Sequence, residues 1–482
     1  MGYFKKLGCL TEDILIVDLD GTVLKSDMLH ESFWSALGRD WRVLFRSLLA
    51  FCRGRAALKG YLFQVSDVDL DLLPYDDDVI TYVKKFRERG GRTALVTGTT
   101  QKFADKIAEK LDIFDEVHGS DLKNNLKGAS KAEFLIDRFG NEGFVYIGDS
   151  KADLRPWAAA KKAVTVNASS SLRKDVEAMG KPYEHLETMS RSIKPYFKVL
   201  RFHQWVKNVL IFSPIIMAHC LDVVLVGKGV IAFIAFSFTA SSGYVLNDLF
   251  DLAADRQHPR KKTRPIASGD ARIHLSSLLA LALLMFGLLL AASLSIEFFI
   301  IIIVYFLFTI TYSMTLKRKI ILDIFMLAGL YTMRIVAGGL ASNIELSFWL
   351  IAFSTFFFFA LAAMKRQAEL IDLSGRDGES PEGRSYSIND LPLISIITIC
   401  SGYLSVLVMA QYVNSPAVIK LYTLPEALWG VCGVLLYWLT HMAMTTHRGA
   451  MNDDPVLFAI KDWVSKFCFC AILGIGILAA VW

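Results

Sequence analysis

Long apolar runs after residue 200 constrain this chain more than any other feature of its sequence. Each run is roughly 17 to 25 residues long, the length that a helix needs to cross about 30 Å of hydrocarbon. Up to about residue 190, by contrast, charged and apolar residues alternate as in a soluble domain. We therefore predict a soluble N-terminal half and a C-terminal all-α bundle of nine transmembrane helices. The nine runs lie near 203–219, 228–246, 273–293, 297–314, 321–340, 346–364, 391–412, 425–444 and 464–481.

Basic residues in the loops predict the orientation of this bundle. Loops on the side of residues 248–272 hold 16 Lys or Arg, whereas loops on the opposite side hold only Lys228 and Lys420. Because Lys and Arg are enriched in cytoplasmic loops, the segment 247–269 is predicted to be cytoplasmic. The first residues contain no long apolar stretch, so no signal peptide is expected. An odd number of helices then places the C-terminus outside, in a protein of the bacterial inner (plasma) membrane.

The overall composition excludes several classes of partner and site. The net charge is only +5, and we expect a phospholipid membrane, not nucleic acid, as the partner. The seven cysteines form no CxxC pair, so neither a disulfide framework nor a zinc site is indicated. The oligomeric state does not follow from the sequence.

Three short apolar runs in the soluble half lead into polar residues. The run "ILIV" is followed by Asp18 and Asp20 in "DLDGT", and the run "RTALVTGTT" ends in hydroxyl residues and a glycine. A third run, "GFVYIG", leads into Asp149 and, four residues later, Asp153. Strands that end in polar residues predict a doubly wound α/β domain, in which ligands bind at the carboxyl edge of the sheet.

These segments resemble the haloacid dehalogenase-like (HAD) phosphohydrolases over roughly residues 12–170. The resemblance implies that Asp18 is the nucleophile that accepts the phosphoryl group, which splits one difficult displacement into two easier steps. It also implies that Asp20 is the general acid and base and that Thr97 hydrogen-bonds the phosphoryl oxygens. Lys131 fits best as the lysine that offsets the charge, with Lys127 as a less favoured substitute.

The HAD resemblance further implies a Mg²⁺ site and a cap. Asp149 and Asp153 would complete the metal site with Asp18 and the main-chain carbonyl of Asp20, because Mg²⁺ favours oxygen ligands and phosphate partners. Residues about 25–85 look like a small helical cap, and caps select the substrate in this superfamily. The alternative interpretation is that each Asp only caps a helix or a turn. The order of the four motifs, which contain Asp18 and Asp20, Thr97, Lys131, and Asp149 and Asp153, argues against this alternative.

The segment "NDLFDLAADRQHPRKKTRPIASG" (247–269) directly follows an apolar run. Asp248, Asp251 and Asp255 are three and four residues apart, so they share one face if the helix continues past the membrane edge. Aligned carboxylates beside a cavity can hold a divalent metal that bridges a diphosphate. The alternative interpretation is an ordinary cytoplasmic loop whose basic residues are paired with solvated acidic residues. Such a loop would require neither Asn247 nor this regular spacing. The remaining phosphate oxygens can be bound by nearby basic residues, namely Arg256, Lys261, Lys262 and Arg264.

This segment resembles the first Asp-rich motif, NDxxDxxxD, of the UbiA superfamily of intramembrane prenyltransferases, and the resemblance covers about residues 195–482. It implies nine helices and Mg²⁺ bound by Asp248 and Asp251. Most members transfer a prenyl group from a prenyl diphosphate to an aromatic or other acceptor. One branch, the decaprenyl-phosphate phosphoribosyltransferases, transfers phosphoribose from phosphoribosyl diphosphate (PRPP) to a polyprenyl monophosphate. Several segments look closer to that branch: 201–214, 255–269, 312–339 and 364–370.

The second motif departs from the pattern of the aromatic prenyltransferases. It contains Asp323 followed by Arg334, and lacks the DxxxD that those enzymes carry. The departure favours a basic site for a substrate with several phosphates. That site would draw on Lys317, Arg318, Arg334, Lys365 and Arg366, with Asp323 nearby and with Glu369, Arg384 and Tyr386 as weaker candidates.

Together the two resemblances predict a bifunctional enzyme. Transfer from PRPP to a polyprenyl phosphate lipid would leave a 5-phosphate on the ribose, which a phosphatase could then remove. One alternative is an ordinary prenyltransferase that uses prenyl diphosphate beside an unrelated phosphatase, and another is a non-enzymatic lipid or phosphate carrier. We place the HAD-like domain at 1–175, a linker or interfacial segment at 176–200, and the transmembrane domain at 201–482.

Overall fold

The computed structural model of the chain describes residues 13–121, 125–189, 192–220, 222–374, 385–451 and 454–481. These residues divide into two compact units. The first contains the described residues up to Val199 together with Asp248–Leu278, and the second contains Leu200–Asn247 together with the described residues from Leu279 onward. The Asp-rich segment therefore belongs to the same unit as the N-terminal domain.

A six-stranded parallel sheet forms the centre of the first unit, with the strand order β3-β2-β1-β4-β5-β6. Strand β1 is central, and Val17 lies opposite Leu95 of β2 and Ile147 of β4. This sheet confirms the predicted doubly wound α/β fold. The strands are β1 (Ile14–Val17), β2 (Arg92–Thr100), β3 (Glu116–Ser120), β4 (Phe144–Gly148), β5 (Lys162–Val166) and β6 (Tyr183–Leu186).

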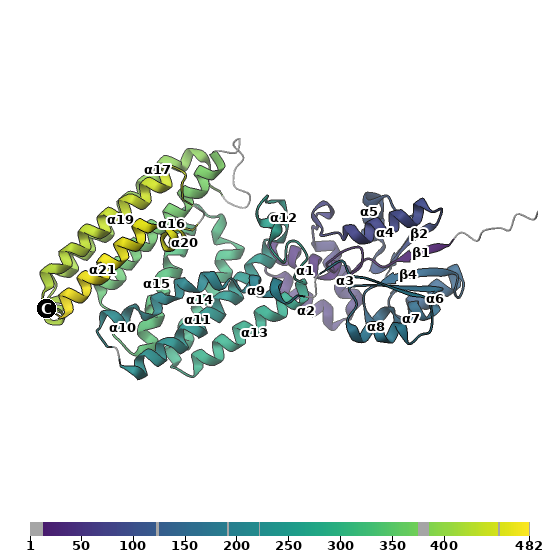
Figure 1. Cartoon of the computed structure of the whole chain (residues 1–482), viewed down its shortest axis with the longest axis horizontal. Coiled ribbons are helices and arrows are strands. Elements are labelled where there is room, and N and C mark those ends of the chain that lie inside the picture. Colours follow the sequence, from purple (N-terminus) through teal and green to yellow (C-terminus); the bar gives the residue numbers. More distant parts are fainter. Residues whose placement is uncertain are drawn as a thin grey trace, which may run out of the picture. The chain divides into compact units, whose positions relative to one another are not determined.

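Helices cover both faces of the sheet, which explains why "ILIV" is apolar throughout. Successive side chains of a strand point to opposite faces. Leu15 and Val17 pack in one cluster with α4 and α5, whereas Ile14 and Ile16 pack in another with α6, α7 and α8. Figure 1 shows these two helical layers on either side of the sheet. The helices are α4 (Asp77–Glu88), α5 (Gln101–Leu111), α6 (Ala129–Phe139), α7 (Leu154–Ala159) and α8 (Ser170–Glu177).

The predicted helical cap is confirmed as an insertion between β1 and α4. It contains α1 (Met28–Arg39), α2 (Val43–Cys52), α3 (Arg55–Val65) and the 3₁₀ turn η1 (Leu70–Leu72). Its two ends are held together by main-chain hydrogen bonds, from Lys25 to Pro74 and from Asp76 to Val23, each 2.9 Å long. The cap is thus an insertion whose first and last residues lie side by side at the edge of the sheet.

The segment 176–200, predicted as a linker, contains regular structure. Strand β6 lies within it and pairs with β5, and helix α9 (Lys194–Leu200) follows. The four residues of β6 are too few for their apolar pattern to indicate a strand in the sequence.

Eight helices in the described part of the chain are long and apolar enough to cross a membrane. They coincide with eight of the nine predicted runs and confirm an all-α transmembrane half. These helices are α11 (Val223–Phe250), α13 (Ile273–Ala292), α14 (Ile296–Met314), α15 (Leu322–Ser342), α16 (Phe348–Ser374), α17 (Leu391–Val413), α19 (Trp429–His447) and α21 (Trp463–Val481). Shorter elements join them: α12 (Leu252–Gln257), η4 (Lys261–Thr263), η5 (Leu316–Arg318), η6 (Ile388–Asp390), α18 (Pro416–Leu421), η7 (Pro425–Leu428) and α20 (Pro455–Lys461).

The remaining predicted helix, near 203–219, is not a long α-helix. The segment forms the 3₁₀ helix η3 (Phe202–Phe212) followed by the short helix α10 (Ser213–Met217). Pro214 accounts for the break between the two pieces, because proline lacks an N–H and is tolerated only in the first turn of a helix.

This segment nevertheless runs antiparallel to α11. Near its start, the indole N–H of Trp205 donates to Ser241 Oγ at 2.9 Å. Near its end, the ring of Phe212 lies 6.1 Å from that of Phe233. Because a 3₁₀ helix rises about 2.0 Å per residue, the two pieces together approach the thickness of the hydrocarbon layer. The η3–α10 segment therefore packs along α11 over most of its own length, although it is not itself a long α-helix.

Candidate active sites

Asp18 is the first residue after β1, at the carboxyl edge of the sheet. Its N–H donates to the carbonyl of Ile147 at 3.0 Å, which keeps the main chain paired with β4 up to this residue. The N–H of Leu19 donates to Asp18 Oδ1 at 2.9 Å. These hydrogen bonds hold the Asp18 carboxylate where the sheet ends, which is where ligands bind in such folds.

Lys131 forms a buried ion pair with Asp18. Its Nζ lies 2.8 Å from Asp18 Oδ1, and the residue, which is in the first turn of α6, is only 2% exposed. The same ammonium group donates to the Tyr146 hydroxyl at 3.0 Å, and that hydroxyl donates to Asp153 Oδ1 at 2.7 Å. The structure therefore brings the favoured lysine to Asp18, while Lys127 lies in the loop before α6.

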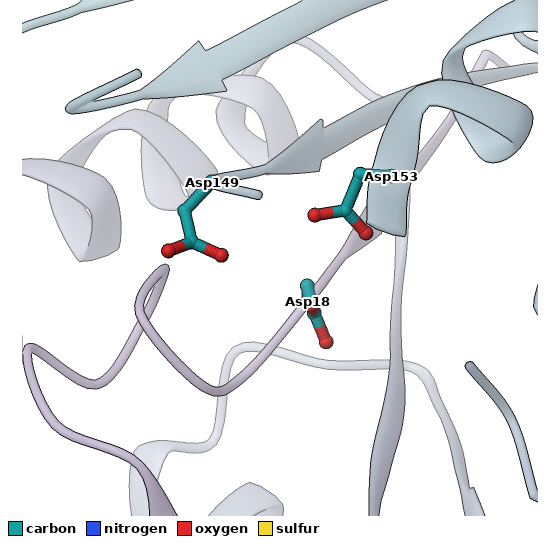
Figure 2. A group of neighbouring side chains, drawn as sticks. All are labelled: Asp18, Asp149 and Asp153. Carbon is teal, nitrogen blue, oxygen red and sulfur yellow. The ribbon is translucent and has the colours of Figure 1, made fainter. Parts of the chain in front are cut away.

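Three carboxylates converge beside β1 (Figure 2). One oxygen from each of Asp18, Asp149 and Asp153 lies within 4.8 Å of the others. The N–H and the hydroxyl of Ser150 donate to Asp153 Oδ2 at 3.0 and 2.9 Å, which orients that carboxylate. Burial raises the pKa of Asp149 to about 8 and also raises the pKa of Asp18. Closely spaced, buried acidic oxygens suit a small divalent cation, because the cation offsets the charge that burial disfavours.

Two donors hold the side chain of Asp20. The N–H of Met28, the first residue of α1, donates to Oδ1 at 2.9 Å, and Thr99 Oγ1 donates to Oδ2 at 2.8 Å. Burial raises the pKa of Asp20 to about 7, which suits a group that donates and accepts a proton near neutral pH. Gly21 follows with a φ of +75°, and a side chain there would collide with the Asp149 carboxylate. The glycine of "DLDGT" is therefore required by the turn.

Two polar residues at this edge of the sheet, Thr99 and Lys59, were not predicted from the sequence. Thr97 is fully buried and its Oγ1 accepts the N–H of Thr99 at 3.0 Å, while Thr99 itself reaches Asp20. Lys59 of α3 donates to the carbonyl of Gly98 at 2.7 Å, and burial lowers its pKa. The hydroxyls in "TGTT" gave no basis for choosing Thr99, and nothing in the cap sequence pointed to Lys59.

The Asp-rich segment departs from the predicted continuous helix. Helix α11 ends at Phe250, Asp251 is non-helical with φ −98° and ψ 13°, and α12 begins at the next residue. Asp248 and Asp255 are nevertheless brought together, because Arg264 Nη1 lies 3.2 Å from Asp248 Oδ1 and 2.6 Å from Asp255 Oδ2. Burial raises the pKa of Asp255 to about 6. Asn247 is half-buried in the last turn of α11.

In the part of the chain that the structure describes, this segment does not form a compact set of three acidic oxygens like that around Asp18. Asp251 is half-buried, and Asp248 and Asp255 are 4% and 2% exposed. The charge of Lys261 in η4 acts with that of Arg264 to favour the ionised form of Asp255. The donor chemistry fits a divalent cation, because Arg264 offsets the charge of only one of the two buried carboxylates.

Arg256 has a partner that the sequence did not indicate. Its guanidinium forms two hydrogen bonds with the carboxylate of Glu31 in α1, at 3.0 and 2.7 Å, and a third with the carbonyl of Ala267 at 3.0 Å. The side chains of Arg256 and Glu31 are only 7% and 3% exposed. Arg256, predicted to bind substrate phosphates, thus uses most of its donors within the first unit.

A buried acid–base network in the second unit surrounds Asp323. Arg366 Nη2 lies 2.6 Å from Asp323 Oδ2, and Arg366 Nη1 pairs with Glu369. The hydroxyl of Tyr386 donates to Asp323 Oδ1 at 2.6 Å. Asp323 and Arg366 are both fully buried. Predicted as substrate-binding residues, they neutralise each other within the protein.

Arg334 is enclosed in a similar way. It is 3% exposed, its Nε donates to Asn208 Oδ1 at 2.9 Å and its Nη2 donates to the Tyr305 hydroxyl at 3.1 Å. Of the other predicted basic residues, Lys317 is buried, Lys365 is half-buried and Arg318 is exposed. Arg384 lies outside the described residues.

Replacing Arg366 by Met is expected to destabilise the membrane half. The substitution leaves the Asp323 carboxylate buried without its countercharge, which costs about 3–5 kcal/mol. Thermal unfolding of the purified protein in detergent measures the effect, and Lys319→Met, at an exposed position in the loop after η5, is the matched control. The double variant Asp323→Leu/Arg366→Met should recover most of the loss, because an apolar pair of similar volume tolerates burial. A double variant as unstable as the single one would contradict this interpretation.

Residues 213–376 match the UbiA prenyltransferase family, and residues 15–155 match the haloacid dehalogenase-like hydrolases. The chain is also 30% identical over 296 residues to the decaprenyl-phosphate phosphoribosyltransferase of Mycolicibacterium smegmatis, covering 58% of this chain and 89% of that protein. The chain belongs to the UbiA prenyltransferase family. This UbiA-family chain is an enzyme that carries a HAD-like hydrolase domain at its N-terminus.

Two rhizobial relatives of this UbiA-family enzyme differ in how much of it they match. Uncharacterized protein y4nM of Sinorhizobium fredii is 36% identical over 468 residues, which is 96% of this chain and 90% of that protein. Nodulation protein NoeC of Azorhizobium caulinodans is 34% identical over 284 residues, which is 58% of this chain and 91% of that protein. The combination of both domains in one chain is therefore shared with the first relative.

Proposed function

We propose that this UbiA-family enzyme transfers 5-phosphoribose from PRPP to a polyprenyl phosphate and then removes the 5-phosphate, giving a polyprenyl-phosphate pentose. The observation that carries the first step is the 30% identity to a decaprenyl-phosphate phosphoribosyltransferase over 89% of that protein. The second step is supported by the buried arrangement of Asp18, Lys131 and the converging carboxylates. The product of the first reaction is a phosphate monoester, which is the class of substrate that the second site suits.

In the proposed phosphatase reaction, an Asp18 oxygen attacks phosphorus and the P–O bond to the ribose C5 oxygen breaks. The leaving oxygen takes a proton from Asp20, whose pKa of about 7 suits this exchange. Asp20 then accepts a proton from the water that attacks the aspartyl-phosphate, which releases phosphate and restores Asp18. Lys131 offsets the charge on Asp18. Mg²⁺, held by Asp18, Asp149, Asp153 and the Asp20 carbonyl, would neutralise the phosphoryl oxygens when bound.

In the proposed transferase reaction, a phosphate oxygen of the lipid forms a bond to C1 of the ribose while the bond from C1 to the diphosphate breaks. Asp248 and Asp251 would hold Mg²⁺, which supplies charge neutralisation to the leaving diphosphate when bound. Arg264 lies beside Asp248 and Asp255 and is 28% exposed, so it can contact a substrate oxygen. The other proposed phosphate ligands are Asn247, Lys261, Lys317 and Lys365, whereas the enclosure of Asp323, Arg334 and Arg366 suits residues that position the surrounding helices.

An apolar cavity in the second unit supports a lipid substrate. It lies between α15 and α16, has a volume of about 300 Å³, and is lined by Phe325, Ala328, Gly329, Met333 and Phe359 among others. An isoprenoid chain has no polar atoms, so a mainly apolar cavity can accept it from the hydrocarbon layer at little cost. We propose that this cavity receives part of the polyprenyl chain.

We also propose that both active sites face the cytoplasm of a bacterium. The proposal rests on the 16 Lys or Arg in loops on the side of residues 248–272. A cytoplasmic location suits PRPP, which is a soluble phosphorylated sugar. The C-terminus is then outside if the η3–α10 segment crosses the bilayer along with the eight long helices.

Product analysis of the full chain in detergent tests the proposed function. The protein is incubated with Mg²⁺, ¹³C-ribose-labelled PRPP and a polyprenyl monophosphate, and the lipids are examined by mass spectrometry. We expect a labelled pentosyl lipid that lacks the 5-phosphate. A parallel reaction contains prenyl diphosphate and an aromatic acceptor. Consumption of prenyl diphosphate with PRPP untouched would overturn the proposal and support the ordinary prenyltransferase reaction.

Replacing Lys59 by Met is expected to raise the KM for a phosphate ester about tenfold, with a smaller change in kcat. A charged hydrogen bond contributes about 1.5–3 kcal/mol to binding, and Lys59 lies close to Gly98 at the hydrolase site. Steady-state hydrolysis of para-nitrophenyl phosphate by the full chain measures both constants. Lys106→Met, on the exposed side of α5, serves as the control. A fall in kcat at constant KM would contradict a binding role for Lys59.

A further inference from the structure

Helix α2 of the cap carries its large apolar residues on the outside. Trp41, just before the helix, is 56% exposed, and the apolar residues that follow are between 50% and 66% exposed. The inward positions are occupied by Val43 and Ser47. In a water-soluble domain the outward stripe of a helix is polar, so this arrangement is inverted. We call the exposed set the α2 face: Trp41, Leu44, Phe45, Leu48, Leu49 and Phe51.

The segment that carries the α2 face is basic, although Asp40 directly precedes it and accepts the N–H of Arg42. Residues 41–66 contain no Asp or Glu, and they include five basic residues. Arg42, the residue before the helix, and Arg46 within it are exposed, and the guanidinium of Arg42 lies 6.0 Å from the centre of the Trp41 ring. Aromatic and aliphatic residues flanked by arginine are typical of helices that lie in the headgroup region of anionic membranes.

Contacts of the preceding helix place the cap beside the ends of membrane spans. Within the first unit, the indole N–H of Trp34 in α1 donates to Ser277 Oγ at 3.2 Å, and its ring centre lies 5.4 Å from that of Phe250. Phe250 is the last residue of α11, and Ser277 lies just over one turn into α13. The ends of transmembrane helices lie at the membrane surface. Since α2 follows α1 after three residues, the α2 face is within reach of lipid headgroups.

We propose that the α2 face lies in the headgroup and upper acyl region of the bilayer, with phospholipid as its occupant, and that it holds the hydrolase cap at the membrane surface. The ten residues of α2 extend about 15 Å, so the helix is too short to cross the bilayer and lies along it. Helix α3, the next element, places Lys59 beside Gly98 at the hydrolase site. The membrane-bound helix is thus one helix away from that site. The class of substrate that such a cap admits is a lipid-linked phosphate monoester, and this part rests on the proposed function.

A fluorescent label on α2 tests the lipid contact directly, whether or not the phosphatase is active. The full chain, with its native cysteines replaced by alanine, carries Leu48→Cys labelled with NBD in nanodiscs of three parts phosphatidylethanolamine to one part phosphatidylglycerol. Glu109→Cys, exposed on α5 of the same domain, is the matched control. Lipid with a nitroxide near the headgroup should quench the Leu48 label at least about threefold more than the control, and iodide should quench it less.

Two results of this measurement would overturn the proposal. Equal quenching of the two labels by the nitroxide lipid would show that the α2 face is in water. A Leu48 label shielded from both nitroxide lipid and iodide would show that a protein surface, such as a second copy of the chain, covers it.

An activity measurement then tests whether the α2 face serves a lipid-linked substrate. The variant Phe45→Glu/Leu48→Glu should hydrolyse para-nitrophenyl phosphate as the wild type does, because neither residue is in the buried core. Its KM for a polyprenyl-linked phosphate in the same nanodiscs should rise about tenfold. Unchanged hydrolysis of the lipid substrate would overturn a role for the α2 face in substrate capture. If the wild type hydrolyses neither substrate, the proposed function fails, while the label measurement still decides the lipid contact.

Discussion

Asp18→Asn is expected to stop the reaction at the 5-phosphorylated lipid. The amide oxygen of asparagine carries no negative charge and is a poor nucleophile. Hydrolysis of the phosphate ester should therefore fall on the order of 10³-fold or more. Transfer from PRPP should proceed as in the wild type, because it does not use this carboxylate. Mass spectrometry of the lipids would then find a product heavier than the wild-type product by one phosphate.

Two further variants show whether this loss is specific. Asp137→Asn removes an exposed carboxylate from α6 and should give the wild-type product. Asp20→Asn should also accumulate the phosphorylated lipid, because the leaving oxygen loses its proton donor. If Asp18→Asn still yields the dephosphorylated lipid, another group removes the phosphate and the assignment of the nucleophile is wrong.

Asp248→Asn is expected to abolish pentosyl transfer and to leave hydrolysis of para-nitrophenyl phosphate intact. Asp248 is 4% exposed and shares the guanidinium of Arg264 with Asp255. Loss of the Asp248 charge removes a proposed metal ligand and leaves Arg264 with Asp255 alone. We expect at least about a 10²-fold fall in PRPP consumption, the scale seen when one preorganised electrostatic contact is removed.

The control for this variant comes from the same loop. Asp270→Asn changes an exposed carboxylate that pairs with Ser268, and it should leave transfer unchanged. Thermal unfolding in detergent distinguishes a fold defect from a chemical one. Equal PRPP consumption by wild type and Asp248→Asn would contradict a role for the first Asp-rich motif in the reaction.

The sequence predicted those parts of the fold that depend on contiguous patterns. The run "ILIV" is apolar because both faces of β1 are covered, and the acidic residues follow it because the strand ends there. Long apolar runs likewise predicted eight of the candidate spans, because the length and composition of a segment can be read directly from its sequence. Pro214 is present in the sequence, but proline interrupts a helix only when it lies beyond the first turn. The break at Pro214 was therefore not predictable without knowing where the helix begins.

Contacts between residues far apart in the chain were not predictable from these patterns. Glu31 and Arg256 form a buried ion pair although they are 225 residues apart in the chain. From its local sequence, each would be taken for an ordinary exposed charge. The hydrogen bond from Lys59 to Gly98 depends on α3 packing against β2, and the buried ion pair of Asp323 with Arg366 depends on α15 packing against α16. A single sequence specifies which residues are acidic or basic, but the topology decides which of them are paired.

The membership of Asp248–Leu278 in the first unit has a consequence for dividing the chain. A cut near residue 200 looks natural, because the two families that the chain matches lie on either side of it. Such a cut would separate Arg256 from Glu31 and Ser277 from Trp34. Each fragment would expose a surface that the intact chain buries, including an unpaired charge in both. The boundary between the two family matches and the boundary between the two folded units are therefore at different places in the chain, and separately expressed halves would have to associate to restore either surface.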